Sequence, residues 1–127
     1  MAQNHTASGQ LASVLPLAAA LVNGKTTAIL KSQELEVMRI VLLAGKAMAE
    51  HWAPGEITLQ CIEGAIEFTS PHGVSVMRAG DLIHLCAREP HSLKALEDSS
   101  ALLTMCLRPG ESAAPQNGAP PQASSGG

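Results

Sequence analysis

The sequence predicts a single all-β domain, a sandwich or barrel of short antiparallel strands, on three observations. Short apolar runs alternate with turn signals such as Pro54-Gly55 and Gly80-Asp81, roughly every eight to twelve residues. No helical periodicity separates these runs, which disfavours a parallel α/β sheet. The 127 residues, 46% of them apolar, suit one domain with a sizeable core.

The strands are expected in order along the chain, after a short helix or turn within residues 11–22. Residues 1–10 are polar and are expected to be a flexible start, so that the barrel domain spans 11–108. From 109 to 127 the chain is rich in Pro, Gly, Ala and Ser, which predicts a disordered tail. The expected strands are 26–30, 35–43, 57–63, 65–69, 74–78, 82–86, 91–96 and 101–107.

Charge and hydropathy exclude two classes of partner. The formal net charge is −3 and Lys and Arg do not cluster, so we expect no nucleic-acid role. The apolar stretch 11–22 is interrupted by Pro16 and is too short to span a bilayer, and it lacks the basic flank of a signal peptide. We therefore expect a cytoplasmic protein without membrane contact. One Phe, one Trp and no Tyr predict an aliphatic pocket.

Two segments combine Gly, His and Pro residues in a fixed order around a strand. Residues 45–64 read GKAMAEHWAPGEITLQCIEG, with a Gly, a His, a Pro-Gly turn, a strand and a closing Gly. Residues 80–91 read GDLIHLCAREPH, with a Gly-Asp turn, a strand and a His after a Pro-containing turn. The two segments resemble the two motifs of the cupin superfamily, in particular of compact single-domain bacterial cupins of the type-2 kind. The resemblance implies a small antiparallel jelly-roll β-barrel over roughly residues 35–107.

The resemblance also implies a metal site. Such barrels commonly hold a metal through two His and a Glu of the first motif and one His of the second. His51 and His91 match two of these positions, whereas Ala53 and Thr58 stand where the other His and the Glu are expected. The implied cofactor is a divalent transition metal, Zn, Fe, Ni, Cu or Mn.

Strand alternation adds candidate residues to the two histidines. Residues 58, 60 and 62 share one face of a strand, so an inward Thr58 predicts an inward Gln60. The set of His51, Gln60 and His91 then forms either a hydrogen-bonded polar cluster or a weak metal site completed by water or a ligand.

Further candidates lie on the strand at 82–86 and in the turn after it. His84 and Cys86 share one face and become metal ligands if that face is inward. Arg88, in the turn before His91, has the forked donors that clamp a carboxylate at a barrel mouth. The expected ligand pocket comprises Met48, Thr58, Ile62, His84 and Arg88.

Three functions follow as alternatives. The first is a binding module, a homodimeric cupin barrel that holds a small molecule, with or without a weakly bound metal. The second is a metal-dependent cupin enzyme of the dioxygenase, isomerase or lyase type, in which the metal acts as a Lewis acid or activates water or dioxygen. The third is a sensor or regulatory cupin without chemistry.

Overall fold

The structure of the protein, a computed structural model, describes residues 5–107. The expected C-terminal tail at 109–127 lies outside the described residues. Expected and observed strands agree to within a few residues, except that β3 replaces a stretch that pattern reading left without a strand. The elements are a 3-10 helix η1 (Ala18–Asn23) and the strands β1 (Thr27–Lys31), β2 (Leu35–Leu42), β3 (Ala47–His51), β4 (Ile57–Glu63), β5 (Ala65–Ser70), β6 (Gly73–Arg78), β7 (Leu82–Leu85), β8 (His91–Ala95) and β9 (Ser99–Cys106).

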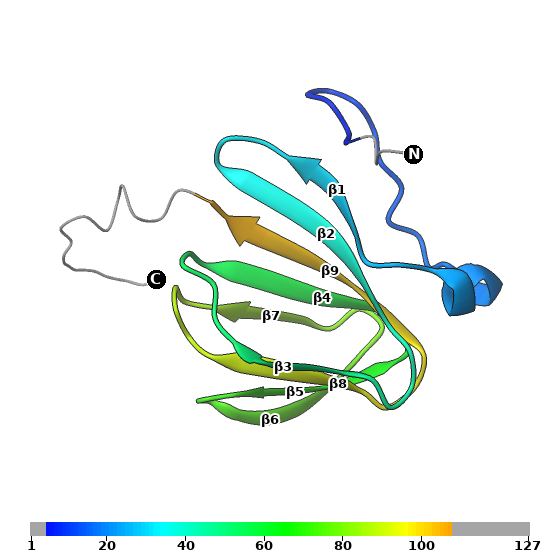
Figure 1. Cartoon of the computed structure of the whole chain (residues 1–127), viewed down its shortest axis with the longest axis vertical. Coiled ribbons are helices and arrows are strands. Elements are labelled where there is room, and N and C mark those ends of the chain that lie inside the picture. The colour runs from blue at the N-terminus through cyan, green and yellow to red at the C-terminus, as the bar shows by residue number, and fades with distance from the viewer. Residues whose placement is uncertain (1–4, 108–127) are drawn as a thin grey trace, which may run out of the picture.

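The strands form two antiparallel sheets that face each other as two layers (Figure 1). One sheet has the order β1-β2-β9-β4-β7 and the other has the order β3-β8-β5-β6. Neighbours in both sheets are mostly strands distant in sequence, such as β2 with β9 and β3 with β8. The chain therefore passes back and forth between the two sheets, and all strand pairs of the described residues are antiparallel. This arrangement confirms the predicted all-β class and its antiparallel barrel.

The core between the two sheets is aliphatic, as the composition predicts, with Phe68 as its one buried aromatic ring among the described residues. Both sheets contribute, because successive side chains of a strand point to opposite faces. The buried residues that form this core are Ile40, Leu42, Ile57, Leu59, Cys61, Ile66, Phe68, Met77, Leu85, Leu93, Ala95 and Ala101.

The face of β4 that enters the barrel is opposite to the expected one. Ile57, Leu59 and Cys61 are 4%, 2% and 0% exposed, whereas Gln60 is exposed to solvent. The prediction that Thr58, Gln60 and Ile62 point inward is therefore wrong. The physical reason is the cost of burial, since the apolar members of an alternating strand gain by leaving water and an unpaired amide loses.

A β-bulge in β3 brings His51 into the barrel. Met48 pairs with Leu93 of β8, and the register shifts before His51 pairs with His91. Strict alternation from Met48 would send residue 51 to the outer face, because three steps along a strand reverse the side-chain direction. The extra residue of the bulge restores the inward direction, a common use of bulges beside functional sites.

Hydrogen bonds attach the N-terminal segment to Glu63, the last residue of β4. The carboxylate of Glu63 accepts hydrogen bonds from the N–H groups of Leu17 and Ala18, at 2.9 and 3.0 Å, and from the hydroxyl of Ser100. These contacts attach η1, which confirms the expected short N-terminal helix. In the described residues, no helix has the length and hydropathy needed to cross a bilayer.

Candidate functional site

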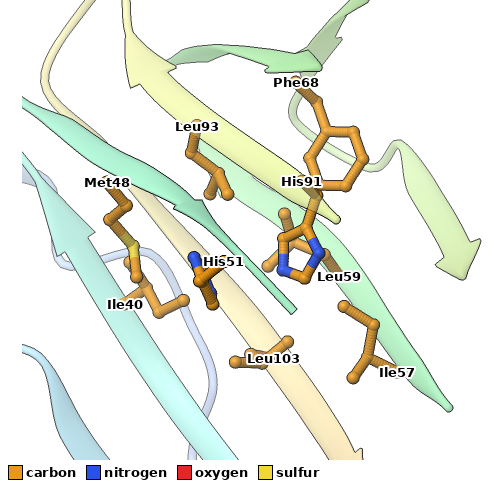
Figure 2. Close-up of a pocket in the computed structure, with 9 residues that line it drawn as sticks. All are labelled: Ile40, Met48, His51, Ile57, Leu59, Phe68, His91, Leu93 and Leu103. Carbon is orange, nitrogen blue, oxygen red and sulfur yellow. The ribbon is translucent and has the colours of Figure 1, made fainter. Parts of the chain in front are cut away.

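Two histidines meet inside the mouth of the barrel. His51 at the end of β3 and His91 at the start of β8 are cross-strand partners. Their ring centroids lie 4.5 Å apart with the planes tilted by 58°. Figure 2 shows the two rings close together among aliphatic side chains. The two motifs thus place their histidines in one site, although forty residues of chain separate them.

Backbone carbonyl groups set the tautomer of both rings. Nδ1 of His51 lies 2.9 Å from the carbonyl oxygen of Ala49, and Nδ1 of His91 lies 3.0 Å from that of Glu89. A carbonyl oxygen only accepts, so each Nδ1 carries the proton and donates. In a neutral ring Nε2 then holds a free lone pair, which is the state that binds metals.

The two rings differ in their surroundings. His51 is exposed, whereas His91 is only 5% exposed and stacks on Phe68 with a centroid distance of 5.7 Å. Burial lowers the pKa of His91 below its ordinary value of 6.5, and the nearby His51 acts in the same direction against the hydrogen bond to Glu89. His91 is therefore held as the neutral imidazole, with Nε2 available at neutral pH.

The cavity beside the histidines is small and almost wholly apolar. The space open to the centre of a water molecule is about 10 Å³, which holds roughly one water. An organic ligand larger than this binds only at the mouth, where His51 is exposed, unless side chains move. The lining comes from both sheets and consists of Ile40, Met48, His51, Ile57, Leu59, Phe68, His91, Leu93 and Leu103.

Glu89 connects the loop that precedes His91 to its neighbours through hydrogen bonds. Its carboxylate accepts a hydrogen bond from the N–H of Cys86 at 2.9 Å and lies 2.7 Å from Nε2 of His72 in the β5–β6 turn. The N–H of Arg88, a residue with a left-handed φ of +66°, donates to Ala53 at 2.8 Å. The loops that follow β3 and precede β8 are therefore tied together around the mouth.

The donor set fits part of the metal site that the resemblance implies. Two imidazoles that share one ion at about 2.0–2.1 Å have ring centres roughly 4.5 Å apart at a donor–metal–donor angle of about 90° and roughly 6.5 Å apart when the donors are opposite, and the observed 4.5 Å lies at the lower limit of this range. The carboxylate is missing, because Ile57 and not an acidic residue faces the histidines from β4. Among residues 5–107 no three His, Cys, Asp or Glu side chains are arranged to hold an ion.

Several predicted site residues lie away from the cavity. Gln60 is exposed on the outer face, so it does not join the two histidines. His84 is also exposed and its Nε2 lies 2.7 Å from Oε1 of Glu56. Cys86 and Arg88 are exposed as well. The condition under which His84 and Cys86 become metal ligands is therefore not met, because Ile83 and Leu85 occupy the inner face of β7.

Of the residues expected to form the ligand pocket, the structure places only Met48 on the cavity. Thr58 and His84 instead line a shallow groove of about 180 Å³ on the outer face of the five-stranded sheet. Ile62 and Arg88 line neither space. The remaining residues of the outer groove are Leu35, Glu56, Ile57, Thr104 and Cys106.

Sequence reasoning missed two residues that shape the site. Phe68 stacks on His91, and Ile57 lines the cavity from β4, whereas Thr58, at the position of the implied Glu, does not. The inward direction of Ile57 could have been predicted from the sequence, because apolar and polar residues alternate from 57 to 61. Nothing in the pattern around Phe68 pairs it with a histidine twenty-three positions away.

Comparison with solved structures identifies proteins with a similar fold. No protein-family model and no curated protein matches the chain. A cupin superfamily protein from Desulfitobacterium hafniense superposes with a TM-score of 0.67 at 15% identity, covering 83% of this chain and 96% of that one. An RmlC-like cupin from Shewanella frigidimarina gives 0.64 at 14% identity, with 86% and 96% covered.

An enzyme is also among the similar structures. Salicylate 1,2-dioxygenase from Pseudoaminobacter salicylatoxidans gives a TM-score of 0.63 at 18% identity, covering 70% of this chain but 28% of its own. At these identities the likeness concerns the fold alone. This chain therefore has the cupin fold that its two motifs predicted.

Proposed function

We propose that this chain is a small binding module in which His51 and His91 hold a transition-metal ion through their Nε2 atoms, and that a small molecule at the mouth completes the coordination. One observation carries the proposal. Both rings donate Nδ1–H to backbone carbonyls and lie 4.5 Å apart, so two free lone pairs belong to one site.

Charge and space favour binding over a reaction inside the barrel. With no carboxylate at the cavity, a divalent ion keeps its full positive charge and attracts an anionic or neutral ligand to its open positions. The cavity admits roughly one water, so such a ligand lies at the mouth beside His51. The aliphatic lining leaves no room for a substrate in the interior, so a reaction inside the barrel is disfavoured.

We further propose that the module works as a homodimer in the cytoplasm. Leu82 and Leu35, on the outer face of the five-stranded sheet, are 63% and 40% exposed, and exposed apolar residues on one sheet face favour a contact between copies. The cysteines at 61, 86 and 106 are free thiols, the usual state in a reducing compartment.

The test is a calorimetric titration of Zn²⁺ into tag-free protein purified without chelators. We expect one equivalent to bind to the wild type. His51→Ala and His91→Ala should each weaken binding at least tenfold, because each removes one of two strong donors. A wild type that shows saturable binding neither of Zn²⁺ at millimolar concentration nor of Cu⁺ in oxygen-free buffer would end the proposal.

His84→Ala is the matched control, since it removes an imidazole from the outer face. We expect its Zn²⁺ affinity to stay within twofold of the wild type. An equal loss in His84→Ala and His91→Ala would place the ion outside the barrel and contradict the assignment. Elemental analysis of the same preparations shows which metal the protein retains during purification.

A further inference from the structure

No carboxylate and no thiol of the described residues lines the cavity. Among the lining side chains, atoms with donor lone pairs belong to the imidazoles of His51 and His91 and to the thioether of Met48. Figure 2 shows Met48 and His51 among the residues that line the cavity. The other lining side chains are hydrocarbon. A metal ion in this cavity meets soft or borderline donors and no compensating negative charge.

Ion charge decides which metal such a cavity accepts. The cost of moving an ion from water to an apolar site rises with the square of its charge, so a divalent ion pays roughly four times as much as a monovalent one. Sites for divalent ions offset this cost with carboxylates or thiolates, or with at least three imidazoles and a bound water or hydroxide. The described residues offer none of these donor sets at the cavity, which therefore disfavours Zn²⁺ and other divalent ions relative to a monovalent one.

Donor chemistry points in the same direction. Thioether sulfur is a soft ligand that selects Cu⁺, and imidazole also binds copper. Met48 has three rotatable side-chain bonds, so its sulfur adjusts to an ion held by the two rings. The bulge in β3 supports this set, because it places both Met48 and His51 on the cavity although they are three residues apart.

We infer that the barrel mouth is a Cu⁺-selective site formed by His51, His91 and the sulfur of Met48. The inference rests on the proposed function, since it assigns the ion and a third ligand to the same pair of histidines. It also explains why a cavity that β4 lines with aliphatic Ile57 and Leu59, without a carboxylate, is compatible with metal binding. A monovalent ion needs no anionic partner.

The test measures Cu⁺ affinity in oxygen-free buffer by competition with the chromophoric chelator bathocuproine disulfonate. We expect the wild type to bind one Cu⁺ at least a hundredfold more tightly than Zn²⁺. Met48→Leu keeps the volume of the side chain, so the barrel should fold normally. It should weaken Cu⁺ at least tenfold while Zn²⁺ affinity stays within twofold.

Met77→Leu is the matched control, because Met77 is buried in β6 and does not line the cavity. Its Cu⁺ affinity should equal that of the wild type. X-ray absorption should detect one sulfur neighbour of copper in the wild type and in Met77→Leu, and none in Met48→Leu.

Two results would overturn the inference. One of them leaves the proposed function intact, and the other rejects it as well. Normal Zn²⁺ binding together with equal Cu⁺ affinities of wild type and Met48→Leu, or a copper spectrum without sulfur, would reject the Cu⁺ assignment and leave the proposed function intact. Failure of both ions to bind the wild type would reject both.

Discussion

The two ends of β4 carry polar clusters that differ in how completely they are hydrogen-bonded. At the end of β4, the carboxylate of Glu63 accepts three hydrogen bonds and lies near the charge of Arg39. At the start of β4, beside Ile57, His51 and His91 each use one ring nitrogen, and Nε2 of neither ring bonds to another described residue. Both oxygens of the Glu63 carboxylate are therefore hydrogen-bonded, although Nη1 of Arg39 is buried without a hydrogen-bond partner among the described residues. We call the Glu63 cluster closed and the histidine cluster, with one free ring nitrogen on each imidazole, open.

The difference in hydrogen bonding predicts different roles for the two clusters, stability for the Glu63 cluster and ligand binding for the His51–His91 cluster. A polar group whose hydrogen bonds are satisfied within the protein contributes to stability, whereas an open donor or acceptor in an apolar setting reduces stability and is available to a ligand. We therefore expect changes at the Glu63 end to affect folding and changes at the His51–His91 end to affect binding. The predictions below test this division, from the largest effect to the smallest.

The largest effect is expected for Gly64→Ala, next to the closed cluster. Gly64 has a φ of +87°, and a Cβ there would collide with the backbone of Asp98 and Ser99. Backbone atoms do not yield as a flexible side chain does, so we expect a loss of about 3 kcal/mol or more in the free energy of unfolding. Urea denaturation measures it.

Gly80→Ala is the control for this prediction. Gly80 also has a positive φ, of +95°, but a Cβ there meets no atom within 4 Å. Only the backbone strain remains, at about 1–2 kcal/mol. Equal losses in the two variants would show that the close approach at Gly64 does not hold that end of β4 together.

A smaller effect, and a change in pH dependence, is expected for Glu63→Gln. Burial acts to raise the pKa of Glu63, but the hydrogen bonds from Ser100, Leu17 and Ala18 and the charge of Arg39 lower it below 4.5 overall. The stability that the carboxylate contributes is therefore present above pH 4.5 and is lost as the pH falls through the lowered pKa.

Glu63→Gln replaces one acceptor oxygen with an amide nitrogen. We expect it to cost about 1–2 kcal/mol at pH 7 and to flatten the decline of stability between neutral and acidic pH. Denaturation midpoints over that pH range measure both. Glu50→Gln, at an exposed residue of β3, is the control and should reproduce the wild-type curve. An unchanged acid decline in Glu63→Gln would contradict the assignment.

The sequence predicted most of the fold because the relevant signals are local. Alternating apolar runs and Gly or Pro turns bound the strands to within a few residues. The meeting of His51 and His91 was also predictable, but only from the order of two motifs, since no local pattern pairs β3 with β8.

Register at β-bulges was the part that could not be derived from the sequence. Thr58, the position of the implied Glu, is six residues before the closing Gly64 of the motif, and the pairing of β4 with β9 shifts between Cys61 and Glu63, within that interval. An extra residue within such an interval reverses the side-chain direction, and a bulge leaves no mark in residue composition. The direct alternation of Ile57, Thr58 and Leu59 was the more reliable signal.

The smallest change in stability, despite a loss of binding, is expected for His91→Leu. Leucine keeps an apolar contact with Phe68 and removes an imidazole from a site that is 5% exposed. The lost hydrogen bond to Glu89 and the gained apolar burial are each worth about 1 kcal/mol and act in opposite directions. The free energy of unfolding should thus stay within about 1 kcal/mol of the wild type.

Leu93→Ala calibrates this measurement at the same cavity. Leu93 is 4% exposed and is two residues along β8, and its truncation should cost about 2–5 kcal/mol as an ordinary core cavity does. His91→Leu should instead remain folded and fail to bind Zn²⁺ and Cu⁺, because one of the two imidazole donors is gone. If His91→Leu were as damaging to stability as Leu93→Ala, the imidazole would be a structural part of the core, and the contrast between the two ends of β4 would not hold.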